Sequence, residues 1–337
     1  MRMTQVRDKK DIPLLQTAEY YSSSEYPELV DYATKQLNSM WLHTDPNVPA
    51  DEHSFKSELS VPEVAGVVQV LKLIVQYELD LGNNFWAKIP SVLPRAEVQR
   101  MCSTFANMEV AVHSPFYAEV NKLMGNDTPE FYLAYKKDPV LVDRMAFITK
   151  HCRLHQDSTV EEILLSFATL AYMEGAVLYS LFAYLKSFQT NGFNKVPSVV
   201  TGVDYVVIDE ELHLKGASLL FQMLLRQAEF TESELSVLLT KVRKLGIGVA
   251  EHEEAIISLI FKGGEVPSIN SENLKYFMQS RVDLVNQNLL GDAIYIPTNT
   301  IVADSFYKNI QSPTIVDYFV RTNTAYSRHW NKSKLAW

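Results

Sequence analysis

Apolar residues recur every three to four positions over most of the chain, which is the spacing of one face of an α-helix. Short segments with proline or glycine separate these stretches. The pattern predicts helices at about 27–41, 61–81, 95–124, 138–156, 159–189, 198–226, 232–261 and 271–288. With only 12 glycines and 14 prolines in 337 residues, a turn-rich all-β fold is disfavoured. The sequence therefore predicts an all-α protein.

Three of the predicted helices begin with the pattern of a capping box. In this motif a hydroxyl and a glutamate three residues later each bond a free backbone amide of the first turn. The candidate pairs are Ser60 with Glu63, Ser158 with Glu161, and Thr231 with Glu234. Because each pair directly precedes a long apolar run, the three matches support the predicted helix starts.

One predicted helix is apolar on every face. Residues Ile163 to Leu185 are long enough to cross a bilayer, and their single charged residue, Glu174, lies near the centre. Such a segment is either a membrane span or the central helix of a large bundle. Since the sequence contains no second segment of this kind, we expect the buried helix. In both cases the Glu174 carboxylate needs a partner.

Charge and cysteine content narrow the class of protein. The 31 lysines and arginines against 40 acidic residues give a net charge of −9, the wrong sign for a protein that binds mainly nucleic acid. Cys102 and Cys152 cannot form a disulfide framework and lack the spacing of a zinc site. The N-terminus lacks the apolar core of a signal peptide. We expect a cytoplasmic protein with no nucleic-acid or membrane partner.

The change in sequence character along the chain predicts three parts. Residues 1–26 are expected to form an N-terminal arm, and residues 27–312 a single helical domain. Residues 313–337 are aromatic and basic without a regular period, which predicts a flexible C-terminal tail.

Acidic residues occur inside the apolar stripes of four predicted helices, where such residues are rare. The four acids are Glu78, Glu109, Glu174 and Glu210, and two of the stripes add His113 and His213. Taken singly, each residue is more often a boundary residue, half of an ion pair or a hydrogen-bonded core histidine. The stripes offer no lysine or arginine for four buried acids, so pairing does not explain the set. Two divalent cations would balance four carboxylates, which predicts a buried dinuclear metal site.

The spacing of the residues fits this prediction in one helix and departs from it in another. Glu210 and His213 have the Glu-x-x-His spacing found in di-iron carboxylate bundles. Glu109 and His113 are one residue further apart, but on an ideal helix offsets of three and four residues both face one site. Pro115 follows at once, so we expect the helix to be distorted there.

Over about residues 35–225 the chain resembles the small, radical-generating subunit of class I ribonucleotide reductase. The resemblance rests on 76–82 (QYELDLG), Asn107-Met108-Glu109 followed by His113 and Tyr117, Glu174 in its apolar helix, and 209–214 (DEELHL). It implies a ferritin-like helical bundle that forms a homodimer and binds two iron ions, with manganese or a mixed pair as alternatives. It also implies an oxidoreductase, a ribonucleoside-diphosphate reductase whose large catalytic subunit is the partner of this chain.

The resemblance assigns roles to individual residues. It gives one metal ion to Glu78, Glu109 and His113 and the other to Glu174, Glu210 and His213, with Glu109 and Glu210 as bridges. It makes Tyr117 the tyrosine that stores the radical, inside an apolar pocket of Leu178, Phe182 and Val206. Along the transfer route it implies Trp41, Asp209 and, in the tail, Tyr326, which would hand the radical to the large subunit.

Several positions depart from the family's pattern. Glu78 stands where many members have aspartate, and the tail is basic where many are acidic. Leu178 stands where an aromatic residue is common. If the helix kept the family's spacing, Val110 would occupy a ligand position. We assign the ligand to Glu109 because it follows Glu78 by 31 residues, as in the family.

Two other functions compete with this interpretation. A related di-metal carboxylate oxidase or oxygenase would use the same ligands but needs a substrate pocket beside them. An iron-storage or purely structural bundle is the remaining alternative, and it leaves Trp41 and the tail unexplained.

Overall fold

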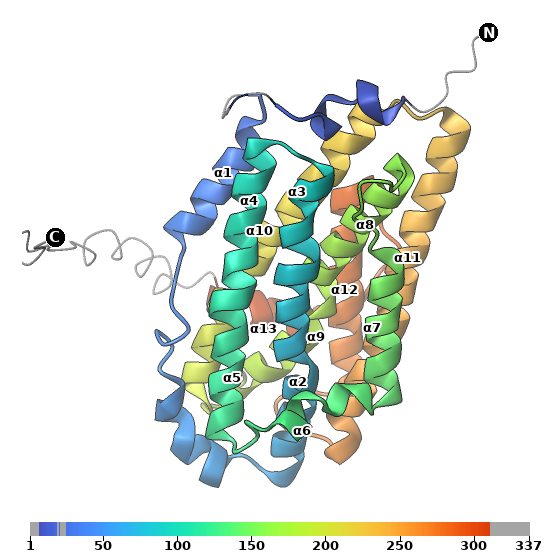
Figure 1. The fold of residues 1–337 in the computed structure, drawn as a ribbon. Helices are drawn as coiled ribbons and strands as arrows, with labels where there is room; N and C mark the ends of the chain where they lie inside the picture. The colour runs from blue at the N-terminus through green and yellow to red at the C-terminus, as the bar shows by residue number, and fades with distance from the viewer. Residues whose placement is uncertain (1–6, 19, 21–24, 311–337) are drawn as a thin grey trace, which may run out of the picture.

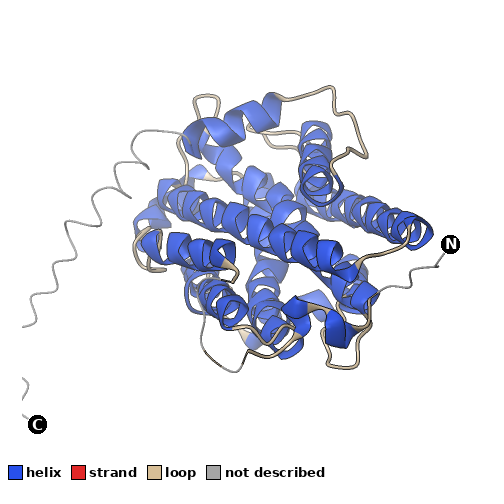
Figure 2. Ribbon diagram, turned by 90° about the horizontal axis from the view of Figure 1, so that it is seen from above, coloured by secondary structure: helices blue, strands red, loops and turns tan. Residues whose placement is uncertain are grey.

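The computed structural model describes residues 7–18, 20 and 25–310. This part of the chain is helical (Figure 2), and its only β-type pairing is an isolated bridge between Val266 and Ile269. The predicted all-α fold is confirmed. The predicted tail at 313–337, with Tyr326, lies outside the described residues.

All eight predicted helices are present, some with shifted ends. The longer helices are α1 (Pro27–Asn38), α2 (Val61–Asp80), α4 (Ala96–Met108), α5 (Ser114–Leu123), α7 (Pro139–His151), α8 (Val160–Tyr172), α9 (Tyr179–Lys186), α10 (Pro197–Ala228), α11 (Glu232–Ile260), α12 (Ser271–Leu290) and α13 (Ile301–Ile310). The four-residue helices α3 (Ile89–Val92) and α6 (Pro129–Tyr132) lie in connections. The helix predicted at 138–156 ends five residues early, and α13 was not predicted.

The long helices form one bundle around the apolar segment (Figure 1). Helix α10 packs against α8, α1 against α4, α11 against α12, and α2 against α5. Every residue from 166 to 188 is buried. The stretch Val160–Gln189 is long and apolar enough to cross a membrane, yet 94% of its most apolar window is buried inside the protein. The prediction of a central bundle helix is therefore confirmed.

Two of the predicted capping boxes, at Ser60 and Thr231, are present. The third was predicted one residue too early. Thr159 forms the box with the glutamate three residues later, because it has the extended backbone that a cap requires. The Ser158 hydroxyl instead accepts a hydrogen bond from the backbone N–H of His155 in the preceding turn.

Three π-helical turns interrupt or extend the helices that carry the acids. They are η5 (Leu81–Phe85) after α2, η7 (Glu109–His113) between α4 and α5, and η9 (Met173–Val177) between α8 and α9. A π turn holds one more residue than an α turn, which widens the helix locally, and such turns often occur at functional sites. The helices predicted at 95–124 and 159–189 are thus continuous but not regular.

Candidate metal centre

The six side chains singled out from the apolar stripes meet inside the bundle. Their ligand atoms form two groups, each within 4.8 Å: Glu78, Glu109, His113 and Glu210; and Glu109, Glu174, Glu210 and His213. All six side chains are fully buried. Glu109 and Glu210 belong to both groups. Four separate helical segments therefore deliver two overlapping sets of ligand atoms.

Each histidine directs its Nδ1 atom at three carboxylates. His113 Nδ1 lies 3.0 Å from Glu109 Oε2, 3.4 Å from Glu210 Oε1 and 3.9 Å from Glu78 Oε2. This arrangement gives one imidazole and three carboxylates a common centre.

The second histidine repeats the pattern on the other side. His213 Nδ1 lies 2.7 Å from Glu109 Oε1, 3.6 Å from Glu210 Oε2 and 3.7 Å from Glu174 Oε2. The two imidazole rings stack with their centroids 6.1 Å apart. The geometry is that of two adjacent ion sites that share two carboxylates.

The outer nitrogen of His113 is held by Asp209, one of the residues predicted for the transfer route. His113 Nε2 lies 3.1 Å from Asp209 Oδ2, and the Trp41 indole N–H donates to the same oxygen at 2.7 Å. The Trp41 ring also stacks on the His113 ring, with centroids 5.9 Å apart. Such a carboxylate partner fixes the orientation of an imidazole and leaves the other nitrogen free to bind a metal ion.

Sequence reasoning missed two residues that contact the cluster. The Gln36 amide donates to Asp209 Oδ1 at 2.7 Å, and its Oε1 lies 3.0 Å from His213 Nε2. The Trp86 indole N–H donates to Glu174 Oε1. Gln36 shares the apolar stripe of its helix, so the criterion used for the acids would have found it. Trp86 lies in a short irregular segment and gave no periodic signal.

The π turn η7 explains the four-residue spacing of Glu109 and His113. Its i→i+5 bonding accommodates one extra residue, so both side chains still reach the cluster. Ser114 Oγ donates to the Glu109 carbonyl at 2.8 Å. Val110 packs against Gly82, since a Cβ atom built on Gly82 would stand 2.5 Å from Val110 Cγ2. The distortion expected next to Pro115 is present, and Glu109 rather than Val110 joins the cluster.

The acids and histidines hold protons unevenly when no cation is present. Burial, and then the negative charge of Glu109, raises the pKa of Glu78 and of Glu210 well above the ordinary value. Burial also opposes ionisation of Glu109, but the two histidines outweigh it and lower the pKa of Glu109. In return Glu109 raises the pKa of His113 and His213 against the opposing effect of burial. Without a bound cation, the cluster therefore offsets the charge of its carboxylates by holding protons.

The donor set fits two divalent cations. Both Glu78 oxygens, both Glu210 oxygens and one oxygen each of Glu109 and Glu174 are buried without a hydrogen bond. Within the described residues, no lysine or arginine forms an ion pair with any of the six side chains. Buried carboxylates in this state are costly unless cations bind them. Carboxylate oxygens with imidazole nitrogens suit iron and manganese.

The predicted radical tyrosine and its pocket residues are buried in the same core. Tyr117, Leu178, Phe182 and Val206 are each at most 1% exposed. The Tyr117 hydroxyl has no hydrogen-bond partner among the described residues. Burial, and then the negative charge of Glu78, raises the pKa of Tyr117 well above its ordinary value. The phenol therefore lies within the electrostatic field of the cluster.

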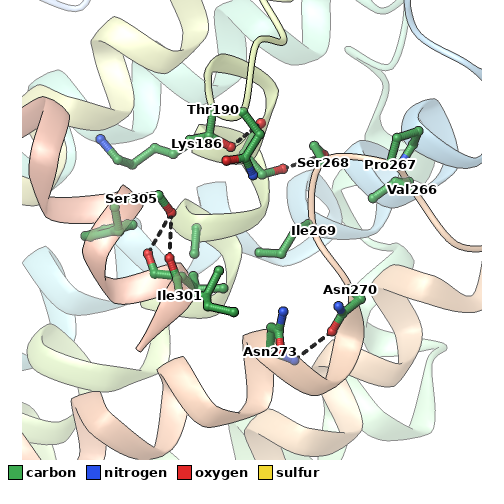
Figure 3. Close-up of a pocket in the computed structure, with 15 residues that line it drawn as sticks. Lys186, Thr190, Val266, Pro267, Ser268, Ile269, Asn270, Asn273, Ile301 and Ser305 are labelled. Atoms are coloured by element: carbon green, nitrogen blue, oxygen red, sulfur yellow. Dashed lines mark hydrogen bonds between the residues drawn. The ribbon is translucent and has the colours of Figure 1, made fainter. Parts of the chain in front are cut away.

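An open pocket of about 270 Å³ lies elsewhere in the molecule (Figure 3). It is bounded by α9, the segment 266–270, the start of α12 and α13, with Lys186, Asn273 and Ser305 among its lining residues. None of the six cluster side chains lines it. This pocket does not supply the substrate cavity that a di-metal oxygenase needs beside its metal ions.

The sequence of the chain is similar to viral reductase subunits. "Probable ribonucleoside-diphosphate reductase small subunit 376L" of Invertebrate iridescent virus 6 is 24% identical over 364 aligned positions, which cover 95% of this chain and 99% of that protein. The ribonucleoside-diphosphate reductase small subunit of Human herpesvirus 8 is 22% identical over 222 positions, covering 64% of this chain and 67% of that protein.

Solved structures share the fold. The ribonucleotide reductase R2 subunit from Clostridium botulinum superposes with a TM-score of 0.75 at 18% identity, covering 87% of this chain and 92% of that one. The dimanganese(II) NrdF of Streptococcus sanguinis gives 0.75 at 18% identity, covering 88% and 100%. The sequence profile described as "Ribonucleotide reductase, small chain" matches residues 18–300. The chain belongs to the family of ribonucleotide reductase small chains.

Proposed function

We propose that this protein binds two redox-active metal ions at the cluster and stores an oxidising equivalent as a radical on Tyr117. Family membership makes the chain the small subunit of a class I ribonucleotide reductase, an oxidoreductase built from two kinds of subunit. The proposal concerns what this subunit contributes. The observation that carries it is the pair of overlapping ligand groups that share Glu109 and Glu210.

Each ion has a set of ligands in the proposal. Glu78 and His113 would hold one ion, Glu174 and His213 the other, and the two shared glutamates would bridge them. We propose iron for both ions, with manganese or a mixed pair as the alternatives, because carboxylate and imidazole ligands accept either metal. The dimanganese(II) protein of Streptococcus sanguinis is compatible with manganese as the alternative.

Bound ions of this kind supply, together with dioxygen, the oxidant for a nearby phenol. The phenol of Tyr117 would lose one electron and its hydroxyl proton. Its burial supports a long-lived radical, since water and reductants are kept away, and Leu178, Phe182 and Val206 would form the apolar pocket around it. The raised pKa of Tyr117 keeps the reduced phenol protonated, so the electron and the proton must leave together.

The hydrogen bonds from Trp41 through Asp209 to His113 support a route for the radical out of the core. Indole and imidazole rings in contact through one carboxylate can move an electron and a proton in step. We propose that Tyr326 continues the route and that the tail at 313–337 docks on the large subunit, although both lie outside the described residues. A homodimer and a cytoplasmic location complete the proposal.

The proposed radical has a direct test. Metal-free protein is loaded with ferrous iron, or with manganese, and exposed to oxygen, and the tyrosyl signal is followed by electron paramagnetic resonance. We expect the signal in wild type and its loss in Tyr117→Phe with both metal ions still bound. Tyr77→Phe is the matched control, because Tyr77 is also buried and also lacks a hydrogen-bond partner for its hydroxyl. If the signal survives in Tyr117→Phe and vanishes in Tyr77→Phe, the radical resides on Tyr77 and the proposed assignment to Tyr117 is wrong.

A second variant separates storage of the radical from its transfer. Trp41→Phe keeps an aromatic ring but removes the donor to Asp209. We expect this variant to form the Tyr117 radical and to fail in ribonucleotide reduction with the large subunit. Full reduction activity in Trp41→Phe would rule out the proposed route.

A further inference from the structure

Two buried arginines donate to the π turn that carries Glu174. In α12, Arg281 Nε donates to the Gly175 carbonyl at 2.8 Å. In α7, Arg144 Nη2 donates to the Val177 carbonyl at 3.3 Å. Both arginines are at most 2% exposed. Backbone hydrogen bonding changes from the α to the π pattern in such a turn, so these contacts add side-chain donors to the carbonyls of an irregular segment.

Arg281 also connects this turn to two other parts of the bundle. Its Nη1 atom lies 2.6 Å from Glu211 Oε1, next along α10 from Glu210, and donates to the Tyr307 hydroxyl of α13. The guanidinium carbon stands 3.5 Å from the centre of the Tyr179 ring. The Tyr179 hydroxyl donates to the same Glu211 oxygen at 3.0 Å. The Arg281 side chain thus contacts Gly175, which follows Glu174, and Glu211, which follows Glu210.

The packing around Gly175 brings Arg281 within reach. A Cβ atom added to Gly175 would lie 2.4 Å from Val285 Cγ2 and 2.9 Å from the Leu214 methyl groups. Only the absence of a side chain lets α12 approach the turn this closely. The contact between Arg281 and the Gly175 carbonyl therefore depends on a glycine placed directly after a cluster acid.

The contacts of Arg281 fall on one side of the cluster. Glu174 and His213 belong to one ligand group, whereas Glu78 and His113 belong to the other. The Arg281 contacts reach the turn of Glu174 and the helix of Glu210, and none of them involves α2 or η7.

We propose that Arg281 is a positioning residue for Glu174. Its loss weakens binding of the ion held by Glu174 and His213 more than binding of the ion held by Glu78 and His113. This inference rests on the proposed dinuclear site. It adds a residue that contacts none of the six proposed ligand side chains and acts through the backbone of the π turn.

Arg281 is a better test residue than Arg144. Arg144 forms its ion pair with Glu253, which is fully buried and also accepts from Ser180. Removing Arg144 would leave that carboxylate buried without a cation, and unfolding is expected. The Glu211 side chain keeps 28% of its surface exposed, so water can solvate it once Arg281 is gone.

The experiment titrates metal-free protein with manganese(II) and follows free ion by electron paramagnetic resonance. Glu174→Gln and Glu78→Gln first identify which binding step belongs to which side. In Arg281→Met we expect the step sensitive to Glu174→Gln to weaken by about tenfold or more, the usual effect of losing an outer partner of a ligand, with the other step changed by less than about twofold. Arg243→Met is the matched control, because Arg243 pairs with Asp292 at the surface and carries the same charge. Equal weakening of both steps, or no weakening, overturns the proposal.

A second readout does not depend on metal. Backbone amide exchange in metal-free Arg281→Met should be faster than in wild type over 173–178 and unchanged over 81–85. If wild type fails to bind two ions, the proposed function fails, while exchange still decides whether Arg281 holds the turn. Should Arg281→Met not fold, Tyr307→Phe removes one contact of the guanidinium, and a smaller weakening of the same binding step is expected. Unchanged binding and exchange in Tyr307→Phe would then count against the proposal.

Discussion

The side chain of Gln36 donates to Asp209 Oδ1 at 2.7 Å, across a sequence separation of 173 residues. The Gln36 Oε1 atom accepts from His213 Nε2 at 3.0 Å, while the other Asp209 oxygen lies 3.1 Å from His113 Nε2. Since a Gln oxygen only accepts, His213 must donate from Nε2, which leaves Nδ1 as the nitrogen that faces the carboxylates. One polar chain from α1 to α10 therefore fixes both imidazoles.

We expect Gln36→Leu to weaken metal binding by about 10- to 100-fold, the range found when an outer hydrogen-bond partner of a ligand is lost. The variant leaves His213 Nε2 and Asp209 Oδ1 without their partner, so the imidazole is free to rotate. Competition with a chelator measures the change. Gln99→Leu, on an exposed position of α4, is the matched control and should bind as wild type does. Wild-type affinity in Gln36→Leu would contradict the orienting role.

Gly82 lies where the chain after α2 passes close to η7. An added Cβ would stand 2.5 Å from Val110 Cγ2 and 3.1 Å from both the Ala106 carbonyl and Glu109 Cβ. We predict that Gly82→Ala destabilises the metal-free protein by about 1–3 kcal/mol, as overpacking of a core does. Urea unfolding measures the loss.

The closest contact in that variant is a side-chain methyl group, so it can be removed separately. Val110→Ala deletes the Cγ2 atom and leaves the backbone contact with Ala106. We expect the double variant to be less destabilised than the sum of the two single variants, because the clash is shared. Additive losses would show that Val110 does not limit the approach at Gly82.

Much of the cluster was predictable because it lies on regular helices. Glu210 and His213 occupy α10, which has no break between Pro197 and Ala228, so their faces follow from the helical period. Gln36 obeys the same rule with Leu29 and Ala33 but was not predicted, since the prediction rested only on acids and histidines in the stripes.

Other features could not be predicted from the helical period. A π turn such as η7 depends on a change of backbone hydrogen bonding, and apolar spacing alone does not locate it. Trp86 reaches Glu174 from a 3-10 segment whose position follows from η5. The short helix α13 lies in a segment where the apolar period is too brief to distinguish from a loop.

The proton balance of the cluster predicts how the metal-free protein responds to pH. His113 and His213 have a pKa raised above 6.5, and burial with negative neighbours raises the pKa of Glu78 and Glu210. A group whose pKa is higher in the folded than in the unfolded state stabilises the fold at pH values below its unfolded pKa. This stabilisation is lost as the pH rises through the folded pKa. The lowered pKa of Glu109 acts only in acid. The free energy of unfolding should therefore fall as the pH rises from about 6 to 9, because these groups lose their protons.

Thermal unfolding of chelator-treated protein across this range measures the effect. The difference in slope between wild type and His213→Gln isolates the cluster from other groups, including Lys186, whose pKa burial lowers to about 7 and which acts in the opposite direction. We expect a shallower fall in melting temperature for His213→Gln than for wild type. His53→Gln, on an exposed histidine, is the control. Identical slopes in all three proteins would contradict the assigned proton balance.

The extra residue of η7 can be deleted to test whether the π turn is an insertion into an otherwise regular site. Ala111 is exposed, and its deletion leaves Glu-x-x-His spacing between Glu109 and His113. The π turn should relax to an α turn, so residues before and after it keep their faces. We expect the variant to fold and bind two ions, measured by circular dichroism and metal analysis. Deleting Ala106 from the regular helix α4 is the control, because it rotates one part of the helix by about 100° against the other and should abolish the site. Loss of both ions in the Ala111 deletion would show that the π turn itself is required to align the ligands.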